Sequence, residues 1–93
     1  MKKIYIVEGS TQEYKTHWYA GCFANEDDAL KYLEACKKED DRISEEMEKT
    51  QRYKPWEYKN KVDPQWERDC GFTDYYIMTA FVQESSDVNN LTE

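Results

Sequence analysis

Residues 25–53, NEDDALKYLEACKKEDDRISEEMEKTQRY, decide the fold because they predict one long helix between segments with strand or loop patterns. At helical spacing the apolar side chains fall on one stripe, which consists of Ala29, Leu33, Cys36, Ile43 and Met47. Acidic and lysine side chains occupy the opposite side. Asn25 can cap the first turn, and the three acidic residues after it favour the positive end of the helix dipole.

The predicted helix is longer than a small sheet. About 28 residues span roughly 42 Å, whereas a strand of about eight residues covers only ~26 Å. Asp40 also interrupts the apolar stripe near its midpoint. Either the helix breaks or frays near residues 39–41, or its second half packs against another chain. In the second case Ile43 and Met47 form an assembly surface, covered in a homodimer or by a partner.

Composition sets the class of protein. The 93 residues suffice for one domain, and an aromatic content of 15% argues against disorder. The net charge of −7 disfavours nucleic acid or an anionic membrane as a partner for the whole surface. No segment has a signal-peptide pattern or the ~20 apolar residues of a membrane span. With three widely spaced cysteines, these features predict a cytoplasmic protein with free thiols.

Three segments outside the helix have strand patterns, at residues 3–8, 14–24 and 73–84. Four consecutive β-favouring residues from Ile4 to Val7 predict a central strand. Residues 9–12 predict a turn, and Gly21 predicts a bulge or a close backbone approach. Residues 85–93 are polar and acidic, which predicts a flexible tail.

The order β-β-α-β predicts an α+β fold over residues 1–84: a three-stranded antiparallel sheet, first strand central, with one long helix on one face. The expected core between sheet and helix consists of Ile4, Ile6, Leu33, Ile77 and Phe81. The second face of the sheet then has no helix to cover it. The long loop at residues 53–71 is the segment that remains for this purpose.

Several stretches together resemble small uncharacterised proteins of bacteriophage genomes. They are the opening KIYIVEGST-EY, the aromatic second strand, the charged helix with its Asn-Glu-Asp start, and the ending VDP…TDYYIMTAFVQE. The similarity covers most of the chain and brings no catalytic residue with it. It implies a phage accessory protein in the host cytoplasm that acts on a host factor, such as a defence protein.

The loop at 53–71 and the residue before it gather aromatic and basic side chains. The candidate binding residues are Arg52, Tyr53, Trp56, Tyr58, Lys59, Trp66 and Arg68. Trp, Tyr and Arg dominate protein-binding hot spots, and rings beside cations can also stack a base and neutralise phosphate. A structural alternative is that Trp56 and Trp66 only cap the open face of the sheet. We therefore predict a non-enzymatic protein that inhibits or redirects a host protein, with a small-molecule or nucleotide binder using residues 53–68 as the alternative.

Catalytic and metal sites have little support in the sequence. His17 is the single histidine and lies in the middle of a predicted strand. Together with the three cysteines (Cys22, Cys36 and Cys70) it lacks the close pairs that zinc sites favour. Helix carboxylates precede lysines by four residues, so a solvated face explains them better than DNA mimicry. We expect no catalytic residue, no metal and no cofactor.

Overall fold

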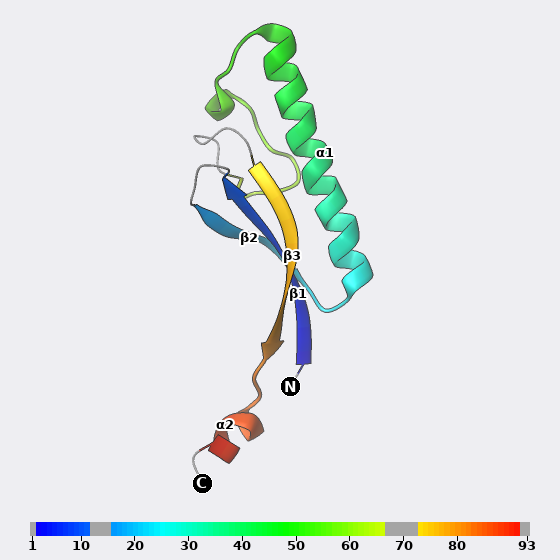
Figure 1. Cartoon of the computed structure of the whole chain (residues 1–93), viewed down its shortest axis with the longest axis vertical. Helices are drawn as coiled ribbons and strands as arrows, with labels where there is room; N and C mark the ends of the chain where they lie inside the picture. Colours follow the sequence, from blue (N-terminus) through cyan, green and yellow to red (C-terminus); the bar gives the residue numbers. More distant parts are fainter. Residues whose placement is uncertain (1, 12–15, 67–72, 92–93) are drawn as a thin grey trace.

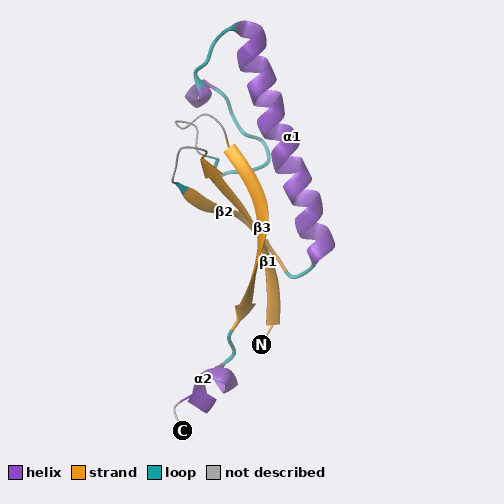
Figure 2. Cartoon of the chain, in the orientation of Figure 1, coloured by secondary structure: helices purple, strands orange, loops and turns teal. Residues whose placement is uncertain are grey.

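The strands form one antiparallel sheet in the order β2-β1-β3, and helix α1 lies along one side of it (Figure 1, Figure 2). The structure, a computed structural model, describes residues 2–11, 16–66 and 73–91. Its elements are β1 (Lys2–Thr11), β2 (His17–Phe23), α1 (Glu26–Thr50), the 3-10 turn η1 (Pro55–Glu57), β3 (Thr73–Val82) and α2 (Ser85–Leu91). The predicted α+β fold with the first strand central is confirmed. No helix in the described ranges is long and apolar enough to cross a membrane.

Helix α1 runs unbroken through Asp40, so the break expected near residues 39–41 is wrong. Asn25 caps it as predicted, because its Oδ1 accepts hydrogen bonds from the backbone N–H groups of Asp27 (2.7 Å) and Asp28 (3.3 Å). The helix ends at Gln51, whose φ of 56° is left-handed. Its 25 residues span ~37 Å.

Strand β1 extends through Gly9 to Thr11, where the sequence predicted a turn. The reason is the packing of Trp18 from β2 across Gly9. A Cβ atom at Gly9 would lie 2.6 Å from the indole ring, so only glycine allows this contact. Packing of a large ring therefore overrides the turn preference of the Gly-Ser-Thr sequence.

A register shift in β2 changes which side chains face the helix. Val7 pairs with Gly21 but Glu8 pairs with Tyr19, so Ala20 is an extra residue, next to the predicted bulge position. The alternation of faces reverses after the bulge. As a result Phe23 packs toward the core, while Cys22 is exposed opposite Ile6.

The core lies between the sheet and α1, and its buried members are Val7, Ala20, Ala29, Leu33, Cys36, Ile43, Trp66 and Tyr75. Leu33 and the partly buried Ile77 were correctly expected there. Ile4 and Phe81 are not core residues, and Ile6 is buried but lies outside this cluster. Because Val7 faces the helix, Ile4 and Ile6 point to the opposite face, and Phe81 is 58% exposed.

The chain after α1 returns along the helix and passes between its second half and the end of the sheet (Figure 1). Residues 58–66 pack on the helix side of the sheet. The alternative that Trp66 caps the face of the sheet away from α1, which we call the open face, is therefore wrong. Trp56 is 53% exposed. At the opposite end of the molecule, α2 lies beyond β3 where the sequence predicted a flexible tail (Figure 1).

Candidate functional site

The segment after α1 is fixed to the sheet by one buried carboxylate. Asp63 is 1% exposed, and its Oδ2 accepts hydrogen bonds from Trp18 Nε1 and from the Tyr75 hydroxyl, each over 2.8 Å. Its Oδ1 accepts from the backbone N–H of Gln65 over 3.0 Å. Burial and the neighbouring Asp63 raise the pKa of Tyr75. The hydroxyl therefore stays protonated and donates a hydrogen bond to Asp63. Asp63 thus ties the segment to both β2 and β3.

A tight turn precedes Asp63. Asn60 Oδ1 accepts hydrogen bonds from the backbone N–H groups of Val62 (2.9 Å) and Asp63 (2.7 Å). From α1, the hydroxyl of Tyr32 lies within hydrogen-bond distance of the carbonyls of Ala20 and Val62. The helix, β2 and the segment therefore meet at one tyrosine.

Glu39, a buried residue of α1, forms a second attachment of the segment, in addition to that through Asp63. Arg42 donates to both carboxylate oxygens, over 2.6 Å and 3.1 Å, and its hydrogen bonds lower the pKa of Glu39. The same carboxylate accepts from the backbone N–H of Lys61, and Arg42 also donates to the carbonyl of Lys59 over 3.3 Å. Residues 59–61 are thereby clamped to the helix.

The second half of α1 is covered by this segment of the same chain. Trp66 is buried, and its Nε1 donates to Asp40 Oδ1 over 3.2 Å, which explains how α1 tolerates an aspartate on its apolar side. Ile43 is fully buried and Met47 is partly buried in the same cluster. The uncovered stripe that suggested an assembly surface at Ile43 and Met47 is therefore filled from within the chain.

The seven candidate binding residues separate into two groups. Trp66 is in the core, and Tyr58 packs against it with its hydroxyl 3.2 Å from Thr50 Oγ1. Arg68 lies outside the described residues. The members with exposed side chains are Arg52, Tyr53, Trp56 and Lys59.

The exposed aromatic rings project where α1 ends and η1 begins, and we call residues 52–57 the tip. Tyr53 is 66% exposed and Trp56 is 53% exposed. Arg52 pairs with Glu57, with Nη2 3.3 Å from Oε2. The turn is closed by backbone hydrogen bonds from Glu57 N–H to the Lys54 carbonyl (2.9 Å) and from Tyr58 N–H to the Pro55 carbonyl (3.0 Å).

Charge also distinguishes this end of the molecule. Between residues 52 and 61 the sequence has four basic side chains and a single carboxylate, Glu57, whereas the whole chain carries −7. The first turn of α1, by contrast, begins with three acidic residues. Residues 52–61, which include the tip, are therefore a basic and aromatic segment of an acidic protein.

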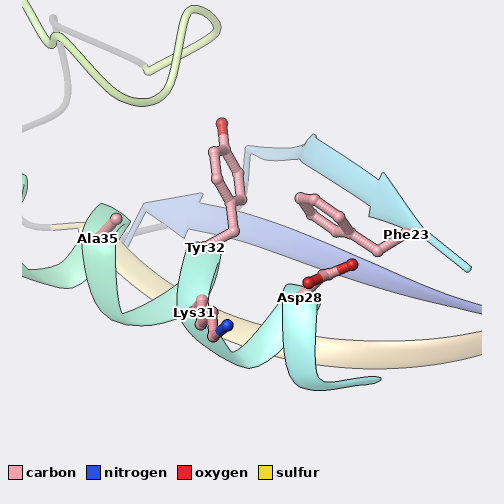
Figure 3. A pocket seen from close by; sticks show the side chains of 5 residues that line it. All are labelled: Phe23, Asp28, Lys31, Tyr32 and Ala35. Atoms are coloured by element: carbon pink, nitrogen blue, oxygen red, sulfur yellow. The ribbon is translucent and has the colours of Figure 1, made fainter. Parts of the chain in front are cut away.

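A second surface feature, which the sequence did not indicate, is an open hollow beside α1 and β2 (Figure 3). It has a volume of about 410 Å³ and is lined mainly by apolar atoms of Phe23, Asp28, Lys31, Tyr32 and Ala35. The rings of Phe23 and Tyr32 lie 5.2 Å apart between centroids. Phe23 reaches this position only because of the bulge at Ala20, so strict alternation along β2 could not have predicted it.

Two further side chains with reactive groups, His17 and Cys36, lie outside the tip. On the open face, His17 Nδ1 lies 3.3 Å from Glu8 Oε1 and 3.2 Å from the Tyr76 hydroxyl, and its side chain is exposed. Cys36 is buried, and burial raises its pKa to about 12, which keeps it a thiol and a poor nucleophile. Within residues 2–11, 16–66 and 73–91, no group of three or more His, Cys, Asp or Glu side chains is placed to hold a metal ion.

Comparison of the chain with protein-family models, curated proteins and solved structures gives no significant match. The tip combines two exposed aromatic rings with basic side chains on a segment that is attached to the core. It is the strongest candidate for a functional site.

Proposed function

We propose that this protein is a non-enzymatic binding protein that inhibits or redirects another protein by direct contact, with the tip as its contact surface. The observation that carries the proposal is the exposure of Tyr53 and Trp56 beside Arg52. These are the residue types that supply most of the binding energy in protein interfaces. The resemblance to bacteriophage proteins makes a host protein, in the host cytoplasm, the expected target.

The attachment of the segment supports this role. Side chains on mobile loops lose conformational entropy when they bind, which offsets part of the contact energy. Here the residues that follow the tip are fixed through Asp63 and Glu39. The rings are therefore presented from a backbone that is already ordered.

Charge indicates what kind of surface the tip would meet. Complementary charges steer association and exclude wrong partners more than they add affinity. The four basic residues at 52–61 favour an acidic target surface, and the remainder of the chain repels it. An acidic partner with an apolar groove for Trp56 fits both features.

The alternative, a small-molecule or nucleotide binder, would use the same rings and cations. Ligand pockets bury about 70–90% of a small ligand. Tyr53 and Trp56 are both more than half exposed, and the hollow in Figure 3 is lined by other residues. We therefore prefer a protein target.

The test is affinity capture of the tagged protein from bacterial lysate, with retained proteins and small molecules both identified. A captured protein is then purified, and its affinity is measured for the wild type and for Trp56→Ala. Tyr19→Ala is the matched control, because Tyr19 is 56% exposed on the open face of the sheet, away from the tip. Retention of a small molecule with no protein would instead support the alternative.

A further inference from the structure

Strand β3 forms an edge of the sheet along its full length. It pairs with β1 from Lys2↔Val82 to Thr11↔Thr73, and no other described strand lies on its outer side. Alternate N–H and C=O groups along an edge strand point away from the sheet and can accept another strand. The chemistry that would satisfy them is an extended backbone.

The two edges of this sheet differ in how well they are protected. Proteins blunt edge strands with bulges, prolines and lysines. Strand β2 has the bulge at Ala20, followed by Gly21. Strand β3 pairs in regular register, contains no proline or lysine, and has one charged residue, Asp74.

The far end of β3 has little support from the rest of the molecule. Strand β2 pairs with β1 no further than Tyr5, so residues 80–82 pair with residues 2–4 in a two-stranded ribbon. Figure 1 shows this ribbon extending past the start of α1. Two-stranded ribbons are marginally stable in water, and here Phe81 and Val82 are exposed on its two faces.

We propose that β3 pairs antiparallel with β3 of a second copy of this chain, which joins the two sheets into one of six strands. The two-fold axis of such a dimer is perpendicular to the sheet, so paired residues share a face. An axis through Met78 pairs residues 74–82 of one copy with 82–74 of the other. This ladder uses nearly the whole strand.

A second copy fits this edge for two reasons. Phe81 points to the helix side of the sheet but lies past the start of the helix. In the dimer it is placed opposite Tyr75 of the other copy. The end of each sheet that α1 does not cover therefore meets the end that α1 covers in the other copy. The two Asp74 residues lie ~27 Å apart along the ladder, well over the ~8 Å Debye length at physiological salt. The pairing is thus symmetric and keeps the two Asp74 side chains apart.

The expected strength follows from size. A ladder ~30 Å long in a sheet ~10 Å thick buries on the order of 600 Å² in total. Interfaces below about 1,200 Å² belong to weak or transient complexes. We therefore expect a reversible dimer, independent of the tip and of the function proposed for it.

The test is analytical ultracentrifugation from about 10 µM to about 1 mM, a range that covers weak association. Met78→Lys places two ammonium groups opposite each other on the axis. Cys22→Lys is the matched control, because Cys22 and Met78 flank Ile6 on the same face from opposite edges. We expect the wild type and Cys22→Lys to dimerise equally, and Met78→Lys and Met78→Glu each to raise the dissociation constant at least about tenfold.

Charge rescue makes the test specific. An equimolar mixture of Met78→Lys and Met78→Glu should recover the dimer, which a merely misfolded variant could not do. A wild type that stays monomeric, a Met78→Lys variant that still dimerises, or equal weakening by Cys22→Lys would each overturn the proposal. If the Met78 variants do not fold, the test is hydrogen exchange of the backbone amides of wild-type β3. Their protection from exchange must rise with protein concentration, and unchanged protection would overturn edge pairing.

Discussion

Trp18 Nε1 donates a hydrogen bond of 2.8 Å to Asp63 Oδ2, across 45 positions of sequence. The same oxygen accepts the Tyr75 hydroxyl over 2.8 Å, so one carboxylate joins both edge strands to the segment after α1. Asp63 and Tyr75 are both buried, so the Tyr75 hydroxyl has no water as a substitute acceptor. The segment that carries the tip is thereby part of the core.

Removal of this acceptor should destabilise the whole domain. Asp63→Ala leaves the buried Tyr75 hydroxyl and the partly buried Trp18 Nε1 without their acceptor, at a cost of about 1–3 kcal/mol for the buried group alone. For a domain of this size, at about 4–8 °C per kcal/mol, Tm should fall by at least ~4 °C. Thermal unfolding followed by circular dichroism measures this, with the exposed Asp41→Ala as control. Equal Tm values for the wild type and Asp63→Ala would show that the network is not formed.

Substitution of Ile43 distinguishes a role in the core of the chain from a role in assembly. It is fully buried within the chain, so Ile43→Ala should cost about 2–5 kcal/mol, as should Leu33→Ala. Phe81→Ala should have a much smaller effect on stability in dilute solution, because that side chain is 58% exposed. Chemical denaturation at several protein concentrations is the measurement. A loss at Ile43 that depends on protein concentration would instead support the assembly surface.

The half-buried Asp40 gives the stability a specific pH dependence. Burial raises its pKa from the ordinary 3.8 to about 6, so the folded state binds a proton more tightly than the unfolded state does. Ionised Asp40 therefore lowers stability above pH 6, and this penalty disappears as the pH falls from about 6 toward 4.

Asp40→Asn should consequently melt at a higher temperature than the wild type at pH 7.5. Its amide oxygen can still accept from Trp66 Nε1, so the hydrogen bond is kept. The difference in Tm should shrink as the pH approaches 4. Asp41→Asn, an exposed neighbour, should show a difference that varies little with pH. A constant or inverted difference for Asp40→Asn would contradict the burial of this carboxylate.

The sequence predicted the fold but not how its faces are used. Periodicity identified α1, and the apolar run of β1 identified the central strand. The apolar run could not show that Val7 rather than Ile6 faces the helix, since both residues are apolar. Nor could it show that Trp18 would lie on Gly9 and keep that residue in the strand, because this contact depends on tertiary packing.

For the candidate site, the sequence predicted that aromatic and basic residues gather after α1 but not which of them are exposed. Tyr53 and Trp56 are exposed, whereas Tyr58 and Trp66 belong to the packing against α1. In a loop without periodicity, nothing in the sequence separates exposed rings from buried ones. The role of Asp63 was also missed, because an aspartate before a proline normally signals only a turn.

The most direct test of the proposed function is the affinity of the captured target for the double variant Arg52→Ala/Trp56→Ala. Aromatic and arginine anchors can each be worth about 2 kcal/mol or more, so the dissociation constant should rise at least about thirtyfold, at 1.4 kcal/mol per decade. Tyr19→Ala should leave it unchanged, and charge reversal at Asp27, Glu34 and Asp41 should mainly slow association at low salt. Circular dichroism must show that each variant is folded. Unchanged affinity in the double variant, together with loss of binding on charge reversal, would contradict the proposal and place the contact on the acidic face of α1.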